Sequence, residues 1–139
     1  MINMKMFLGE YQPNITEGSR IALPKKLREQ IKGDELILSK GFESCVFGYD
    51  KEDWLAEAEK QIENPITDSR TRDLKRYMYS GASETAIDSQ GRIVIPSNLK
   101  EYAKIGKKVV VIGAGDHIEI WDFENWNKHS EKISAMLSD

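Results

Sequence analysis

Two short segments of the chain combine a tight turn with an arginine directly after it. The first reads Thr16-Glu17-Gly18-Ser19-Arg20, and the second reads Asp88-Ser89-Gln90-Gly91-Arg92. Arginine presents a planar fork of donors that can bond guanine O6 and N7 together, and glycine or serine at a turn lets the backbone come near a phosphate. A surface arginine in a salt bridge is the plainer explanation of one such segment. The argument for a role in DNA contact therefore depends on the fact that the segment occurs twice.

The two segments are equivalent positions of an internal repeat. A shift of 72 residues without a gap gives twelve identical pairs within residues 9–54, where ordinary composition would give roughly three. The pairs are Gly9/Gly81, Ile15/Ile87, Arg20/Arg92, Ile21/Ile93, Pro24/Pro96, Leu27/Leu99, Glu29/Glu101, Lys32/Lys104, Gly41/Gly113, Asp50/Asp122, Glu52/Glu124 and Trp54/Trp126. Two copies are too few for a solenoid and suit a pseudo-twofold domain.

Each copy predicts the same elements in the same order. A turn leads into an aliphatic strand that ends at proline, and a short helix follows. Two further strands come next, and then a longer helix with an aspartate as its N-cap. The predicted strands are 20–24, 35–39 and 44–49 in the first copy and 92–96, 107–112 and 117–121 in the second. The N-caps are Asp50 and Asp122, and we expect Trp54 and Trp126 to pack in the core.

The connection between the copies predicts one extra helix. Asn64-Pro65 is a helix stop, and residues 68–79 show a helical pattern with a basic cluster. We therefore divide the chain into a first repeat at 6–64, a connecting basic helix at 65–80 and a second repeat at 81–139. The expected class is α+β with about four helices, and the two copies should be intertwined because each alone holds too little apolar surface to be stable.

The composition disfavours several classes of function. The chain has two histidines and one cysteine, Cys45, so it offers no Cys/His cluster for zinc and no internal disulfide, and it is expected to be cytoplasmic. The glycines at 113–115 fit a hairpin turn, and no apolar run reaches the length of a membrane helix. We expect no catalytic residues, no metal and no cofactor. The net charge of −3 is unusual for a DNA-binding protein, but basic residues cluster at 20–32 and 70–76.

Several of these segments together resemble the MraZ family. Residues 6–11, Met-Phe-Leu-Gly-Glu-Tyr, are similar to its opening, and residues 88–96 resemble its signature, in which an aspartate precedes an arginine by four residues. The arginines before residues 81–84 and the ending at 118–126 are also similar. The resemblance covers nearly the whole chain, from about Met6 to Trp126.

The resemblance implies a fold and a function. MraZ proteins belong with AbrB-like and MazE-like DNA-binding folds, so each chain would hold two swapped-hairpin units in a double-split β-barrel. Family members form rings, for which an octamer or a dodecamer is expected. They bind short direct repeats upstream of the division and cell-wall gene cluster and regulate its transcription, including their own. The implied location is the cytoplasm, in association with the nucleoid, and the implied partners are double-stranded DNA and other copies of the chain.

The same resemblance implies which residues contact DNA. The signature arginines are the expected readers, and the turn and nearby basic residues complete the predicted interface: Arg20, Arg92, Thr16, Gly18, Ser19, Asp88, Gln90, Gly91, Lys25 and Lys26. The first repeat departs from the family pattern, because Thr16 stands where the signature has aspartate. Aspartate forms an Asx turn more strongly than threonine does, so the first turn is expected to orient its arginine less well.

Two other functions remain open on the sequence alone. One is an AbrB-like antitoxin-type regulator, which would usually carry one hairpin and a partner-binding tail. The other is a ring-forming protein scaffold without DNA readout, which would use Trp54 and Trp126 or the acidic helices as contact surfaces. A scaffold would be indifferent to the loss of Arg20 and Arg92. No residue constellation points to a hydrolase.

Overall fold

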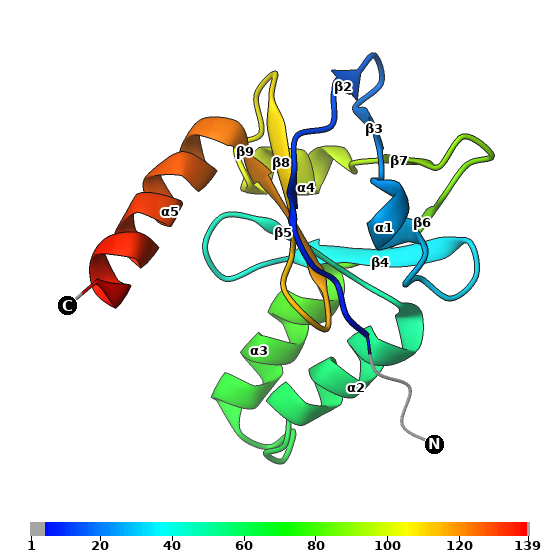
Figure 1. The fold of residues 1–139 in the computed structure, drawn as a ribbon. Helices are drawn as coiled ribbons and strands as arrows, with labels where there is room; N and C mark the ends of the chain where they lie inside the picture. The colour runs from blue at the N-terminus through cyan, green and yellow to red at the C-terminus, as the bar shows by residue number, and fades with distance from the viewer. Residues whose placement is uncertain (1–4, 139) are drawn as a thin grey trace.

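The computed structural model describes residues 5–138 and shows a mixed α+β protein, as predicted (Figure 1). Within this range the strands are β1 (Glu10–Tyr11), β2 (Ile15–Thr16), β3 (Arg20–Ala22), β4 (Glu35–Lys40), β5 (Val46–Tyr49), β6 (Ser83–Ala86), β7 (Arg92–Val94), β8 (Val109–Gly113) and β9 (Ile118–Asp122). The helices are α1 (Lys25–Arg28), α2 (Lys51–Gln61), α3 (Ser69–Ser80), α4 (Ser97–Tyr102) and α5 (Phe123–Leu137). The strands form a six-stranded sheet, β1-β8-β9-β5-β4-β6, and a three-stranded sheet, β2-β3-β7.

The sequence repeat is also a repeat of structure. Strands β7 and β9 begin 72 residues after β3 and β5. In the antiparallel pair β3–β7, Ile21 lies opposite Ile93, and in the antiparallel pair β5–β9, Phe47 lies opposite Glu119. In each pair the two partners are repeat equivalents of each other. A pseudo-twofold axis therefore passes through both strand pairs.

The two repeats exchange strands across this axis. Strand β1 of the first repeat pairs with β8 of the second, with Tyr11 opposite Val111. Strand β6 of the second repeat pairs with β4 of the first, with Ser83 opposite Leu38. Neither repeat thus completes its own part of the six-stranded sheet. The copies are intertwined, as the small apolar content of each copy predicted.

The main core lies between the two sheets. Its side chains come from alternate positions of the strands, because successive residues of a strand point to opposite faces. Ile21 and Ile93 are at most 1% exposed, and Leu27 of α1 and Leu99 of α4 are fully buried against them in the same cluster. Both short helices begin directly after a proline, as the sequence predicted.

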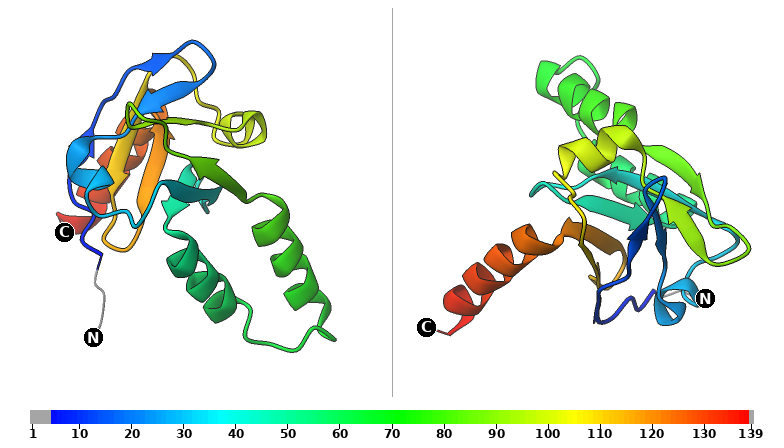
Figure 2. Two further views of the ribbon diagram at one scale, coloured as in Figure 1. Left: turned by 90° about the vertical axis from the view of Figure 1, so that its right-hand side faces the viewer. Right: turned by 90° about the horizontal axis from the view of Figure 1, so that it is seen from above.

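A second, smaller core forms on the outer face of the six-stranded sheet. Ile37 of β4 and Tyr49 of β5 meet Trp54 and Ala58 of α2 there. Helix α3 runs beside α2 and completes a helical hairpin that projects from the sheet (Figure 2). The side chain of Asp68 caps α3 by accepting a hydrogen bond from the Thr71 amide at 3.1 Å.

The two predicted aspartate caps differ. Asp122 accepts from the Asn125 amide at 3.2 Å and caps α5. Asp50 occupies the N-cap position of α2, as predicted, but its side chain makes no capping hydrogen bond. Its carboxylate instead accepts from the Lys32 amide at 3.0 Å and forms a buried ion pair with Lys5.

The two equivalent tryptophans also differ. Trp54 is 6% exposed under the helical hairpin, whereas Trp126 is only half-buried and packs edge-on against Trp121 at 5.3 Å between ring centroids. Helix α5 projects without a second helix beside it and has no buried residue (Figure 1). The prediction that both tryptophans lie in the core is therefore wrong for Trp126.

No helix within residues 5–138 is long and apolar enough to cross a membrane.

The exchange of strands brings the backbone of the first repeat close to Gly113 of the second, so the stability of the fold should depend on this glycine. A Cβ atom added there would overlap the backbone of Phe7 and Leu8. This segment runs beside the end of β8, where Phe7 forms an antiparallel bridge with Gly115. We expect Gly113→Ala to lower the free energy of unfolding by about 1–3 kcal/mol in urea denaturation. The control is Gly106→Ala, whose Cβ would make only an ordinary contact, 3.4 Å from Asp122 Oδ1. Equal stability of the two variants would contradict this close approach.

Candidate nucleic-acid interface

The outer face of the three-stranded sheet carries both predicted arginines. Because Ile21 and Ile93 point into the core, the residues on either side of them point outward. We call this outer surface the ribbon face and define it by Thr16, Arg20, Ala22, Arg92 and Val94. In the register of the sheet, Thr16 lies opposite Arg20, Arg20 opposite Val94, and Ala22 opposite Arg92. The two arginines thus lie diagonally across the dyad, with small side chains between them.

The second turn holds its arginine firmly. Oδ1 of Asp88 accepts hydrogen bonds from the amides of Gln90 and Arg92, both at 2.9 Å. Oδ2 accepts from Arg92 Nε at 2.9 Å, so one carboxylate shapes the turn and orients the guanidinium. Gly91 has φ +76°, in the left-handed region that favours glycine. This is the Asx-type turn that the sequence predicted for aspartate.

The first turn holds its arginine loosely. The hydroxyl of Thr16 donates to the Arg20 carbonyl at 3.3 Å, and no carboxylate of residues 5–138 contacts the guanidinium. Arg20 Nη1 instead donates to the Glu17 carbonyl at 3.3 Å. Gly18 and Ser19 both have positive φ, +80° and +58°. The weaker orientation expected from threonine at this position is thus visible in the geometry.

A basic side chain from the opposite repeat supports each turn. Lys100 of α4 donates to the Ser19 hydroxyl at 3.0 Å at the first turn. Arg28 of α1 covers the second turn, where a Cβ on Gly91 would lie 2.7 Å from its Cζ, and its Nε donates to the Leu23 carbonyl at 3.0 Å. Arg28 and Lys100 are equivalent in the 72-residue repeat. Lys100 was not among the predicted site residues, although its pairing with Arg28 in the repeat was visible in the sequence.

The remaining charges divide between the two ends of the molecule. Lys25 and Lys26 are exposed on α1, directly after β3, and make no hydrogen bond or ion pair within the described residues. The basic cluster at 70–76 lies on α3, at the end of the molecule opposite the β2–β3 turn (Figure 1). Glu17 is an acid within the first turn, and Glu101 lies near Gly18 and Ser19 of that turn. No group of three or more His, Cys, Asp or Glu residues in the described chain is placed to hold a metal ion.

The arrangement is suited to contact a charged, grooved polymer. Arg20 and Arg92 are offset by two residues along their strands, or about 7 Å at the usual rise of a strand. Two base steps along one DNA strand, at about 3.4 Å each, span a similar distance. A β ribbon fits the width of the major groove, and arginine is suited to bond guanine there.

Comparison with known proteins identifies one family. The family model described as "MraZ protein, putative antitoxin-like" matches residues 6–77 and again residues 78–139. Proteins named Transcriptional regulator MraZ include that of Heliobacterium modesticaldum, which is 43% identical and aligns over 96% of this chain and 93% of its own. Those of Syntrophomonas wolfei and Clostridium tetani are 42% and 41% identical, over 96% of this chain and 93% and 98% of their own.

The duplicated ribbon and the names of these relatives together define a class, that of tandem-repeat transcriptional regulators. Both copies of the repeat are matched separately by the same family model, and the relatives align with nearly the full chain. The chain belongs to the MraZ family.

The second turn gives a prediction about pH. Hydrogen bonds from the Arg92 amide, and then from the Arg92 guanidinium and the Gln90 amide, hold the pKa of Asp88 below its ordinary value. A lowered pKa in the folded state means that the ionised carboxylate stabilises the turn at neutral pH and that this stabilisation is lost as pH falls through the lowered pKa. Carboxyl NMR should show the low pKa.

The variant Asp88→Asn should abolish this pH dependence. Its amide keeps the shape of the side chain but cannot form the ion pair, so the Arg92 Nε–H signal should exchange with water faster at neutral pH. Asp73→Asn breaks an exposed ion pair with Arg76 on α3 and is the matched control. An unchanged Arg92 signal in Asp88→Asn would show that the carboxylate does not orient the arginine.

Proposed function

We propose that the protein is a sequence-specific DNA-binding transcription regulator that inserts its ribbon face into the major groove. The observation that carries the proposal is the presence of two equivalent arginines, Arg20 and Arg92, on one exposed face at the pseudo-twofold axis. A shared core residue is expected at equivalent positions of a repeat, but packing does not require a shared surface charge. The exchange of β1 and β6 between repeats supports an AbrB-like swapped-hairpin arrangement of the two units.

In this proposal the residues of the interface divide their roles. Arg20 and Arg92 read base edges, and each bidentate contact to guanine is worth about 1–3 kcal/mol of discrimination. Ser19, Gln90 and the turn glycines approach the phosphates. The exposed Lys25 and Lys26 add phosphate contacts, and the affinity should therefore fall with salt.

The two arginines do not read DNA equally well. Arg92 is already oriented by Asp88, so it loses little conformational freedom on binding, but its partner carboxylate lies close to the DNA. Arg20 pairs with no carboxylate in the part of the chain that the structure describes, and it adapts more freely. We propose that Arg92 sets the position of one fixed base contact and that Arg20 tolerates more variation in sequence.

We propose that several copies act together as a ring. Weak contacts from each copy to spaced, short direct repeats would add through effective concentration. The targets proposed from the family resemblance are the division and cell-wall gene cluster and the protein's own promoter, in the cytoplasm and at the nucleoid. Helix α5 supports self-association, because Trp126, Ile133 and Leu137 repeat along one face of an amphipathic helix that buries no residue within its own chain.

The interface is tested by the double variant Arg20→Ala with Arg92→Ala. Binding to DNA from upstream of the protein's own gene, measured across a salt series, should weaken roughly 100-fold, and the preference over random DNA should be lost. The matched control removes two basic residues of α3, in Lys75→Ala with Arg76→Ala, and should bind nearly as the wild type does. Circular dichroism checks the fold. Full binding by the arginine double variant would overturn the proposal and favour a scaffold without DNA readout.

Self-association is tested on the two faces of α5. We expect Ile133→Glu to dissociate the assembly, because it places a charge in the apolar face, and light scattering after size-exclusion chromatography measures the mass. Ala135→Glu adds the same charge to an exposed position on the opposite face and should leave the assembly intact. Equal masses for the two variants would exclude α5 as the contact.

A further inference from the structure

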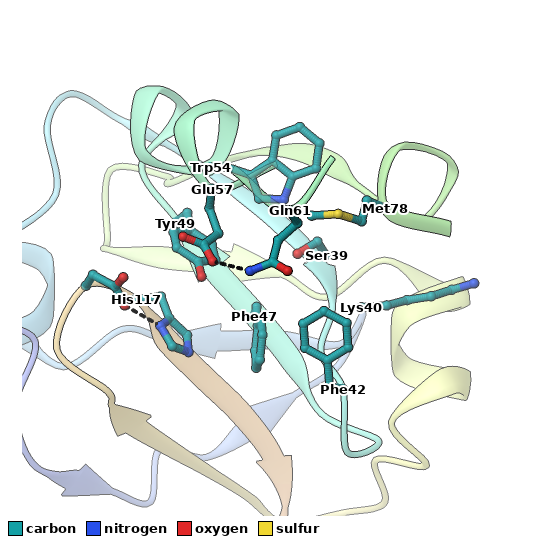
Figure 3. A pocket seen from close by; sticks show the side chains of 11 residues that line it. Ser39, Lys40, Phe42, Phe47, Tyr49, Trp54, Glu57, Gln61, Met78 and His117 are labelled. Atoms are coloured by element: carbon teal, nitrogen blue, oxygen red, sulfur yellow. Dashed lines mark hydrogen bonds and ion pairs between the residues drawn. The ribbon is translucent and has the colours of Figure 1, made fainter. Parts of the chain in front are cut away.

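A pocket of about 190 Å³ lies between the six-stranded sheet and the helical hairpin, away from the ribbon face (Figure 3). Its floor is the outer face of β4 and β5, where Ser39 lies opposite Phe47 and Tyr49 is the next residue of β5 on that face. Its roof is α2, where Trp54, Glu57 and Gln61 fall at helical spacing. The pocket is similar in size to the ~150 Å³ cavity that accepts benzene in an engineered protein, so it suits a ligand with one ring or a short chain.

Aromatic rings form most of its walls. Phe47 lies between Phe42, 5.9 Å away, and Tyr49, 6.4 Å away, with edge-on geometry to both. Phe42 is 59% exposed at the end of this row. Such rings bind apolar groups, and their faces attract cations within about 6 Å.

Two carboxylates contribute negative charge to the lining of the pocket. Glu57 and Asp116 line it, and Gln61, one turn further along α2, donates to the Glu57 carboxylate at 3.0 Å. Burial, and then the charges of Asp116 and Glu57, raise the pKa of Tyr49. The only lysine of the lining, Lys40, points away from the cavity (Figure 3), and its ammonium lies over the rings of Tyr77 and Tyr102 at 5.2 and 5.6 Å.

His117 closes the side of the pocket and is already paired. Its ring stacks on Tyr49 at 5.0 Å, and its two nitrogens lie 2.7 Å from Asp116 Oδ1 and 2.9 Å from Glu119 Oε2. Burial opposes its charged form, but these two carboxylates raise the pKa of His117 above its ordinary value. A protonated His117 offsets Asp116 and Glu119 in part and leaves Glu57 without a cationic partner among the lining residues.

We propose that this pocket binds a small organic cation, an amine that carries one aromatic ring or a short alkyl group. The ring would lie against Phe47 and Trp54, and the ammonium group would contact Glu57. An anion of the same shape is disfavoured by the same carboxylates. The site is separate from the ribbon face, so the proposal does not depend on DNA binding.

The test compares three probes of one shape on the full-length protein: phenethylamine, 2-phenylethanol and phenylacetate. Binding is followed by NMR signals of the tryptophan side chains, with Trp54 as the reporter and Trp126 on α5 as the internal reference. We expect saturable shifts of Trp54 alone and an affinity for the amine roughly tenfold above that for the alcohol, with phenylacetate the weakest. Equal affinity for the three probes, or no saturable shift of Trp54, would overturn the proposal.

A matched pair of variants locates the charge contact. Glu57→Gln keeps the shape of the side chain and should weaken phenethylamine roughly tenfold, with the affinity for 2-phenylethanol unchanged. Glu59→Gln makes the same change on an exposed face of α2 and should bind both probes as the wild type does. If Glu57→Gln loses its fold by near-ultraviolet circular dichroism, the wild-type probe series still decides. Equal affinities in the two variants would remove Glu57 from the site.

Discussion

The pairing of β3 with β7 across the pseudo-twofold axis is the contact on which the rest of the structure depends. It places Ile21 opposite Ile93 in the core, and the alternation of a strand then fixes the direction of every neighbouring side chain. Arg20 and Arg92 point outward because the isoleucines beside them must point inward. A shift of the register by one residue would bury the arginines, so the packing of the core and the chemistry of the ribbon face cannot vary independently.

On this symmetric frame the two halves have acquired different surroundings. A carboxylate orients Arg92, whereas the Arg20 guanidinium donates to a backbone carbonyl. The side chain of Asp122 caps its helix, whereas that of Asp50 pairs with Lys5 and accepts a hydrogen bond from the Lys32 amide. The helical hairpin buries Trp54, but the equivalent Trp126 has no second helix above it. Equivalent residues thus share a backbone position and differ in partners.

Much of the fold could be predicted from the sequence, because the repeat and the strand alternation are local signals. The strands around Arg20 and Arg92, the helices after the two prolines and the Asx turn at Asp88 lie where the residue types placed them. The partners of β1 and β6 could not be predicted, since pairing between repeats leaves no local pattern. The contact of Lys100 with Ser19 and the pocket under α2 are likewise made by segments distant in sequence. Asp50 makes no capping hydrogen bond to α2 and pairs with Lys5, which also lies far away in the chain.

The exchange of strands also constrains how the protein is made. During synthesis β1 emerges first, but its partner β8 emerges only when most of the chain has been completed. Until then β1 has no strand to pair with and the apolar face of the first repeat is exposed to solvent. Exposed strand edges of this kind promote association between chains. A nascent chain that stops after the connecting helix therefore lacks the strands that would close its sheet. Folding to the native state must wait for the second repeat, and such long-range pairing makes it slow compared with a protein of local contacts.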